Sequence, residues 1–545
     1  MVSLHLNGFF LVGNSMALFE WLPTLLSDFE NEHVLIRGSS NLLLSPAHIV
    51  HIEIEDWQPC LHVIAKYPFR WCAMWAEDVP SEKLYIVSAC YEKNGDYFIL
   101  LTEVAHDQPV MPSQTHIFPA ANRTERHIQD MFGIVFSNLT DTRNWTRHQA
   151  WSESDYPLRK DFPVEGINVP DITPPDSFYS FFQAQGTGVY EIPVGPVHAS
   201  IIEPGHFRFQ AVGETILNLE KHLGYVHKGI EKIAEGRNAQ QLARLAGRVS
   251  GDSTVAHTWA ACMAMEKANY VHVPERAIMI RAIMAERERI INHVWDIAAI
   301  CNDVGFAFPY FQLGRLREDW LRTNYTLFGH RLMMDCIIPG GVSTDLNDIE
   351  LQLKEIHTLS RELKDIENIL EQHAGLEDRL VTTGILKPPL AAQLGCLGYV
   401  GKASGQDYDT RHDAPYAPYD QFNIDVPVFE TGDVAARMQV RLKEIHISLS
   451  LLEHMLSKLP RTEGIAIDWK MPFENAEGLG IVEGWRGEII TYVRFGEQGT
   501  ISRYYPRDPS WLNWPALELL IRGNIVPDFP VCNKSVNGSY SGCDL

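Results

Sequence analysis

The sequence lacks three features that would each assign it to a familiar class of protein. None of its nine cysteines belongs to a Cys-x-x-Cys pair, which favours free thiols in a reducing compartment over disulfides. No apolar run approaches the ~20 residues that a helix needs to cross a bilayer. Basic residues are in the minority, and a formal net charge of -23 argues against nucleic acid and against anionic lipid headgroups as partners. An acidic surface of this kind suits a cytoplasmic protein or one with basic partners.

The first 32 residues also lack the basic segment that opens a secretory signal peptide. Glu20 interrupts their apolar run, so we interpret this segment as part of the mature protein. The chain carries no glycine-rich dinucleotide fingerprint, so we expect no nicotinamide cofactor on it.

The distribution of β-rich and helical segments predicts an α+β protein with two domains. Short β-rich runs alternate with helix-like segments over residues 1–165, which predicts a small α/β domain. Four prolines fall within 163–178, and we predict an extended linker over 166–194. Residues 195–545 are predicted to form a mainly helical domain with small β elements.

Three segments of the second domain predict particular elements. Pro274 stands where a first-turn proline belongs, and an apolar pattern follows to Cys301. Residues 349–370 carry an apolar stripe at alternating spacings of three and four, which predicts a helix packed in a bundle. Residues 487–508 predict a β-hairpin.

Two motifs near the end of the first domain resemble the C-type subunit of complex I. ERHIQDMFGIVFSN begins at Glu125, and YPLRKDFPV ends at Val164. They stand in the order and at the separation found in that family, where the second motif leads onto the D-type subunit. The resemblance implies a scaffolding role for residues 1–165, which contain no metal-ligand cluster, glycine-rich phosphate loop or nucleophile elbow.

Six blocks of the second domain resemble, in order, the D-type subunit of complex I and the large subunit of group 4 nickel–iron hydrogenases. The resemblance covers nearly every segment and implies the large-subunit fold. Lys402 stands where arginine is usual. The blocks are 195–209, 224–236, 273–309, 339–342, 402–420 and 432–445.

The positions that match the four metal-binding cysteines of these hydrogenases hold no cysteine. Where the family has Arg-x-Cys-Gly-x-Cys, this chain reads RVSGDS, with Ser250 and Ser253 at the ligand positions. The second pair corresponds to Ser539 and Gly542 in SVNGSYSGCDL. Nickel and iron require soft thiolates here, whereas a serine hydroxyl is a hard, protonated ligand and glycine has no side chain. We therefore predict no metal at this site and no hydrogen chemistry.

Four polar residues match positions that serve proton or acceptor chemistry in the family. Glu231 matches a glutamate that passes protons beside the metal. Arg486 matches the arginine above it, although Trp485 stands where the family usually has proline. His198 and Asp303 match positions that border the quinone pocket of complex I; His206 lies close to the first in another register. Each also has a structural interpretation: a surface helix ion pair for Glu231, a helix end for Asp303, an ion pair for Arg486. We expect Glu231, Asp303 and Arg486 to share one pocket with Ser250, Ser253 and Ser539.

Two further positions limit the chemistry. The quinone-binding tyrosine of complex I falls, by gap-free counting, on Gly251. Cys532 and Cys543 lie near the second ligand pair at a spacing unlike either pair, and we interpret them as incidental thiols, with a rescued metal site as the alternative.

The resemblance implies a peripheral subunit on the cytoplasmic face of the cell membrane, in a complex I-like oxidoreductase. This chain would bind no cofactor itself and would pass electrons from a 4Fe–4S cluster on a neighbouring small subunit to quinone or another small acceptor, coupled to ion translocation. Membrane-arm subunits, including antiporter-like ones, are the other expected partners. Two alternatives stay open: a non-catalytic coupling or assembly subunit, and a hydrogenase with unconventional ligands.

Overall fold

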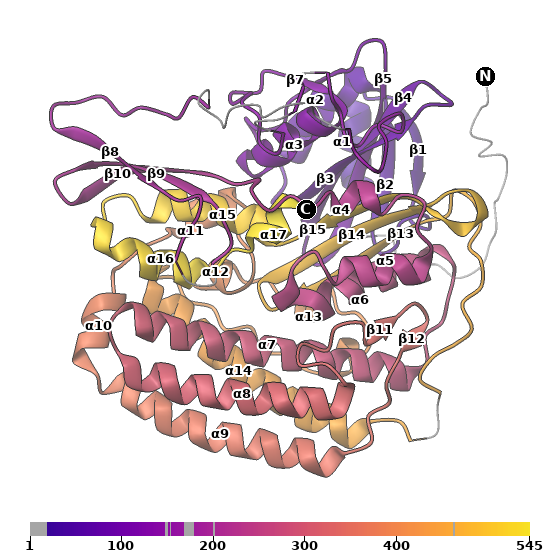
Figure 1. The fold of residues 1–545 in the computed structure, drawn as a ribbon. Helices are drawn as coiled ribbons and strands as arrows, with labels where there is room; N and C mark the ends of the chain where they lie inside the picture. The colour runs from indigo at the N-terminus through magenta and orange to yellow at the C-terminus, as the bar shows by residue number, and fades with distance from the viewer. Residues whose placement is uncertain (1–18, 148–150, 153, 168–178, 200–201, 462–463) are drawn as a thin grey trace.

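The computed structural model describes residues 19–147, 151–152, 154–167, 179–199, 202–461 and 464–545. The fold is α+β, as predicted, with a sheet-containing N-terminal part packed against a mainly helical body (Figure 1).

The N-terminal part is built on a five-stranded sheet in the order β1-β2-β5-β4-β3. Only β2 and β5 are parallel neighbours, and the other pairs are antiparallel. Its central strands are apolar on both faces because one face packs on helices and the other on a second sheet. The elements are β1 (Ile36–Ser40), β2 (His48–Ile52), β3 (Arg70–Val79), β4 (Leu84–Lys93), β5 (Asp96–Ala105), β6 (Val110–Pro112), β7 (Val135–Ser137), α1 (Leu22–Asn31), α2 (Trp57–Ile64) and α3 (Asn122–Phe132).

The linker predicted over 166–194 is only partly within the described residues, because 168–178 lie outside them. Its last six residues are not linker: they form β8 (Val189–Val194), which pairs antiparallel with β9 (His206–Val212). The alternation of apolar and polar residues there favours a strand, and β10 (Thr215–His222) completes the sheet.

Four long helices form the largest helical layer of the body, and two of them were predicted. They are α7 (Glu275–Asp303), α8 (Ala307–Phe328), α9 (Ile349–Glu371) and α14 (Val434–Lys458). Pro274 stands at the N-cap position, one residue before the first turn of α7, and the stripe on α9 is buried from Ile356 to Leu370. The remaining helices and short strands are α4 (Ile230–Ile233), α5 (Ala239–Ala246), α6 (Thr254–Ala268), α10 (Ala374–Leu380), α11 (Pro388–Gln393), α12 (Gly398–Lys402), α13 (Thr410–Asp413), α15 (Ser510–Leu520), α16 (Phe529–Val536), α17 (Tyr540–Asp544), β11 (Ile337–Ile338) and β12 (Gly341–Val342).

The second main sheet connects the two parts of the molecule. It consists of β13 (Glu477–Gly484), β14 (Gly487–Phe495) and β15 (Ile501–Arg507), and the last two are the predicted hairpin. Helix α6 lies against β13 at glycines: a Cβ on Gly478 or Gly480 would come within about 2 Å of a carbonyl oxygen of α6. This close packing fixes the middle of α6 on β13, and the first pair of former ligand positions stands just before the start of this helix.

Candidate functional site

Three serines at the former ligand positions meet in the tertiary structure. Ser250 and Ser253 stand just before α6, and Ser539 caps α17. The hydroxyls of Ser250 and Ser539 are 2.8 Å apart and hydrogen bonded, although 289 residues separate them in sequence. The loop-and-helix frame that would bring the two ligand pairs together is therefore retained without the thiolates.

Arg486 ties this serine group to a carboxylate. From the turn between β13 and β14, its guanidinium donates two hydrogen bonds to Asp252, at 2.7 and 2.6 Å, and one to the Ser253 hydroxyl at 3.1 Å. Burial acts to raise the pKa of Asp252, but the ion pair with Arg486 outweighs it and holds that pKa below its usual range. Arg486 is thus in the site, as predicted, and it also forms the structural ion pair that was its alternative interpretation.

The tryptophan that replaces the family's proline at 485 belongs to the same network. Its indole N–H donates to the Ser253 hydroxyl at 3.0 Å, a bond that proline cannot supply. Tryptophan at position 485 therefore suits a site in which serine hydroxyls occupy the positions of the metal-binding thiolates.

The fourth former ligand position is closed by a carboxylate. A Cβ on Gly542 would lie 2.7 Å from the carboxyl carbon of Asp508. Asp508 is fully buried and bonded to His257 at 2.9 Å. Burial acts to raise its pKa, but His257 outweighs burial and holds the pKa of Asp508 at about 2. The residues present do not fit a nickel–iron centre, because three ligand positions carry hydroxyls and the space at the fourth is filled.

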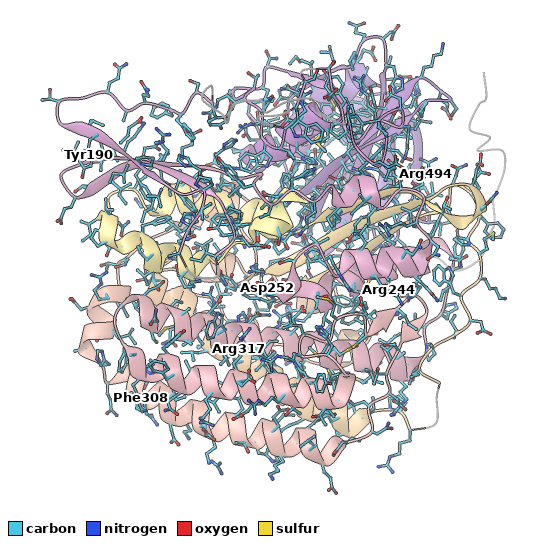
Figure 2. The ribbon with its side chains drawn as sticks, viewed as in Figure 1. Tyr190, Arg244, Asp252, Phe308, Arg317 and Arg494 are labelled. Atoms are coloured by element: carbon cyan, nitrogen blue, oxygen red, sulfur yellow. The ribbon has the colours of Figure 1, made fainter. Side chains whose placement is uncertain are left out.

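A cavity of 360 Å³ opens beside the serines, with polar and charged walls. Ser250, Ser539 and Arg486 line it together with Asp252, labelled in Figure 2.

Glu231 lies outside this cavity, which corrects the expectation of one shared pocket. It is buried, not on a helix surface: one carboxylate oxygen is 2.9 Å from Nε2 of His127 on α3, and the other is 2.7 Å from Arg503 on β15. Burial acts to raise its pKa, but Arg503 and then His127 outweigh burial and bring the pKa of Glu231 to about 2. Its contacts join the N-terminal part to the body.

Neither His198 nor Asp303 lines the cavity. Asp303 is exposed at the last residue of α7, which matches its structural interpretation as a helix-end residue. His198 is hydrogen bonded through Nε2 to the carbonyl of Gly205 at 2.7 Å, and nearby His206 contacts the carbonyl of Gly195. Asp303 was expected in the serine pocket and lies outside it, whereas the match of His198 and Asp303 to the border of a quinone pocket stays a prediction.

Two parts of the site were not identified from sequence. Asp252 stands between the two serines in RVSGDS, so an acidic residue between two lost ligands was an available signal. The Asp508–His257 pair had no such signal, because 251 residues separate its members.

Lys402, where the family usually has arginine, serves a separate buried network. Its ammonium lies 2.6 Å from Asp409 and 2.7 Å from Glu444, and His293 lies 2.6 Å from the same Glu444. All four side chains are almost fully buried. Lysine thus satisfies both carboxylates and links α7, α12 and α14.

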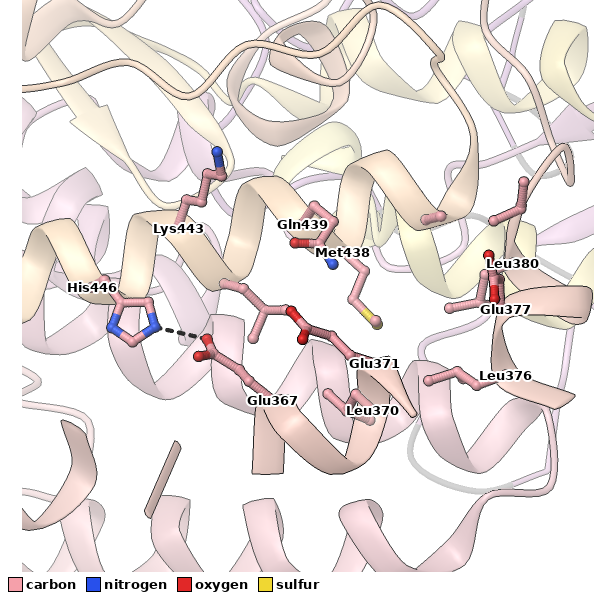
Figure 3. A pocket seen from close by; sticks show the side chains of 13 residues that line it. Glu367, Leu370, Glu371, Leu376, Glu377, Leu380, Met438, Gln439, Lys443 and His446 are labelled. Carbon is pink, nitrogen blue, oxygen red and sulfur yellow. Dashed lines mark hydrogen bonds and ion pairs between the residues drawn. The ribbon is translucent and has the colours of Figure 1, made fainter. Parts of the chain in front are cut away.

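A larger cavity of 450 Å³ lies between α9, α10 and α14 (Figure 3). Its walls combine leucines with surface charges such as the His446–Glu367 pair at 2.7 Å. None of the predicted site residues lines it.

The described ranges hold neither a ready metal-ligand cluster nor a spanning helix. No three His, Cys, Asp or Glu side chains gather within those ranges as a metal-ligand set would require. No helix in the same ranges combines the length and apolarity needed to span a bilayer.

Three protein-family models match the chain. The 30 Kd subunit of respiratory-chain NADH dehydrogenase matches residues 50–168, and the 49 Kd subunit matches 303–478. The model of nickel-dependent hydrogenases matches 228–297, which contains the first former ligand pair.

Curated relatives and a solved structure agree with these models. Formate hydrogenlyase subunit 5 of Escherichia coli K12 is 32% identical over 85% of this chain and 81% of its own length. Hydrogenase-4 component G of the same organism is 33% identical over 82% and 78%. The C/D subunit of NADH-quinone oxidoreductase from Bacteroides fragilis is 31% identical over 77% and 83%. A chain of a membrane-bound sulfane sulfur reductase, an archaeal respiratory membrane complex, shares the fold at a TM-score of 0.62 and 24% identity, covering 67% of this chain and 100% of that one. This chain therefore belongs to the family that unites the fused C/D subunits of complex I with the large subunits of formate hydrogenlyase and hydrogenase-4.

Proposed function

We propose that this chain is the acceptor-site subunit of a membrane-associated, complex I-like oxidoreductase. Electrons from a 4Fe–4S cluster on a neighbouring small subunit would reach quinone or another small acceptor in the serine-lined cavity, with coupling to ion translocation and without hydrogen chemistry. The chain would lie on the cytoplasmic face of the membrane, peripherally, beside antiporter-like membrane-arm subunits.

The observation that carries this proposal is the replacement of the four ligand positions by a connected polar network beside an open cavity. Ser250, Ser253 and Ser539 bond to one another, to Asp252 or to Arg486. A lost metal site that had become purely structural would be expected to fill with apolar side chains, because burying polar groups is costly. The similarity to components of formate hydrogenlyase and NADH-quinone oxidoreductase supports the proposed partners.

The first test concerns metal and hydrogen. The natively purified complex should contain no stoichiometric nickel in this subunit and should neither take up nor evolve hydrogen. Elemental analysis and a hydrogen electrode measure both properties. About one nickel per chain would contradict the proposal and favour a hydrogenase with unconventional ligands.

The second test fills the cavity without disturbing its walls. Gly251 lines the cavity, and a Cβ on it would meet no atom within 4 Å, so Gly251→Leu adds bulk at the wall without a clash; Gly251→Ala is the matched control. We expect the leucine variant to assemble into the complex and to lose acceptor reduction, while the alanine variant keeps it. Normal turnover in an assembled leucine variant would favour the second candidate.

That second candidate, a non-catalytic coupling subunit, is favoured by the position of Glu231. The carboxylate is committed to His127 and Arg503 across the two parts of the molecule and does not reach the cavity. A structural role for this residue is thus sufficient to explain its presence.

A further inference from the structure

Two cations on the cavity wall lack, among the described residues, the partners that the other charges have. Arg317 projects from α8 and stacks over the Trp295 ring of α7, with 4.9 Å between its guanidinium carbon and the ring centre. Among the described residues it forms no ion pair, and its Nε is shielded from solvent without a hydrogen-bond acceptor. Lys534, on α16, lines the same cavity and likewise has no hydrogen bond or ion pair in the described part of the chain. Figure 2 labels Arg317 together with Asp252.

The carboxylates of the cavity are already engaged elsewhere. Asp252 is paired with Arg486, and Asp296 accepts bonds from Arg441 at 3.1 Å and from Asn537 at 2.7 Å. These two carboxylates attract Arg317 over a longer range, yet burial, followed by the repulsion of Arg331, lowers the pKa of Arg317.

The remaining acidic groups do not change this balance. Glu318, the next residue on α8, also attracts Arg317 but is already paired with Arg331 and Arg322. Glu203, the third carboxylate of the wall, accepts the backbone N–H of Ser541 at 3.1 Å and lies in the field of Lys228. Lys534 attracts the Asp303 carboxylate electrostatically, but Asp303 is exposed at the end of α7. Within the described ranges, the cavity therefore presents two positive groups without bonded counter-ions.

We propose that this cavity binds a small anion between Arg317 and Lys534, and that the electron acceptor enters in anionic form. Partly buried cations without counter-ions are unfavourable, and an anion supplies the missing charge. The hydroxyls of Ser250 and Ser539 line the same cavity, but Ser250 already donates its proton to Asp252, so Arg317 and Lys534 are the groups that would bind the anion. A cavity of 360 Å³ accommodates an anion of a few heavy atoms. This inference deepens the proposed function and rests on it for the identity of the site, but binding is measured apart from turnover.

The test titrates sulfate, as a probe anion, into the purified full-length chain by calorimetry at constant ionic strength. We expect saturable binding of one sulfate per chain. Arg317→Met and Lys534→Met should each weaken it at least tenfold, and Arg317→Lys should retain most of it. Arg322→Met on the same helix is the control, because that side chain is 74% exposed and should not matter. Thermal unfolding of each variant identifies misfolding, and Lys534→Met serves alone if Arg317→Met does not fold.

Two binding results would overturn the anion site. These are the absence of saturable sulfate binding, and sulfate binding that is unchanged in both methionine variants. Turnover of the complex with a neutral acceptor, unaffected by either methionine variant, would leave the proposed function standing and remove this inference. Sulfate binding without any turnover of the complex would support the anion site and contradict the proposed function.

Discussion

At the scale of single residues, the site differs from a nickel–iron centre in more than its ligands. Serine for cysteine removes the thiolate, but Trp485 and Asp508 have also adapted: one donates to Ser253, and the other occupies the space beside Gly542. Restoring the cysteines alone would therefore not restore the geometry, because the Asp508 carboxylate would still be in the way.

This crowding predicts that Gly542→Ala is destabilising despite the better helix propensity of alanine. The added Cβ would lie 2.7 Å from Asp508, whose own position is held by His257. Overpacking of this kind costs about 1–3 kcal/mol. Urea unfolding measures the cost. Gly251→Ala, where the new methyl group meets nothing within 4 Å, should change stability by less than about 0.5 kcal/mol. Equal stability of the two variants would show that Asp508 can move freely.

At the scale of elements, the motif helix α3 has a role that its sequence resemblance did not specify. His127, in the ERHIQD segment, bonds Thr146 through one ring nitrogen and Glu231 of α4 through the other. Arg503 of β15 completes the group. Three elements distant in sequence are thus joined by one buried carboxylate.

Glu231→Gln should consequently lower stability by about 3–5 kcal/mol at neutral pH, because it leaves buried Arg503 without its counter-charge. The pKa of Glu231 is about 2 in the folded protein, below its ordinary 4.5. A depressed carboxyl pKa contributes stability above pH 4.5 that is lost as pH falls toward 2. The difference between wild type and variant should therefore shrink over that acid range in chemical unfolding curves.

Glu318→Gln is the control for this comparison. The pKa of Glu318 is also about 2, lowered by Arg331 and Arg322, but its side chain is 38% exposed. Solvent screening reduces the value of such a pair, so the variant should cost about 1 kcal/mol or less. A small, pH-independent effect of Glu231→Gln would contradict the structural role assigned to it.

At the scale of the whole molecule, the N-terminal part and the helical body are joined by aromatic packing and by buried ion pairs. Trp75 of β3 stacks on Tyr492 and Tyr505 of the second sheet, at 5.1 and 5.6 Å between ring centres. Arg70 of the same strand forms a two-bond ion pair with fully buried Glu488 of β14, with its shorter bond at 2.8 Å. Separation of the parts would expose aromatic surface and leave buried charges unpaired.

We therefore expect the chain to unfold in one cooperative transition despite its two-domain sequence. Calorimetry should give a single peak whose measured enthalpy agrees with the van't Hoff enthalpy. Two resolved transitions, with the N-terminal sheet melting on its own, would show that the shared packing contributes less than the internal cores.

The sequence by itself determined the local elements and the family. Apolar periodicity identified α7 and α9, because a helix packed in a bundle must repeat its apolar residues at three and four. The hairpin of β14 and β15 followed from β-rich runs around a turn, and the paired motifs predicted the family. The missing ligands were also apparent from sequence, because Ser250, Ser253, Ser539 and Gly542 fall at defined motif positions.

Only the tertiary structure decided which polar residues share a site. Glu231, Asp303 and Arg486 were expected together, yet only Arg486 reaches the serines, and Asp508 and His257 belong to the site without any signal in the sequence. Helix periodicity depends on neighbours a few residues away, whereas a buried carboxylate takes whichever cation the folded chain brings within about 3 Å. Here those cations came from as far as 418 residues along the chain, as Arg70 did for Glu488, and no local pattern encodes that choice.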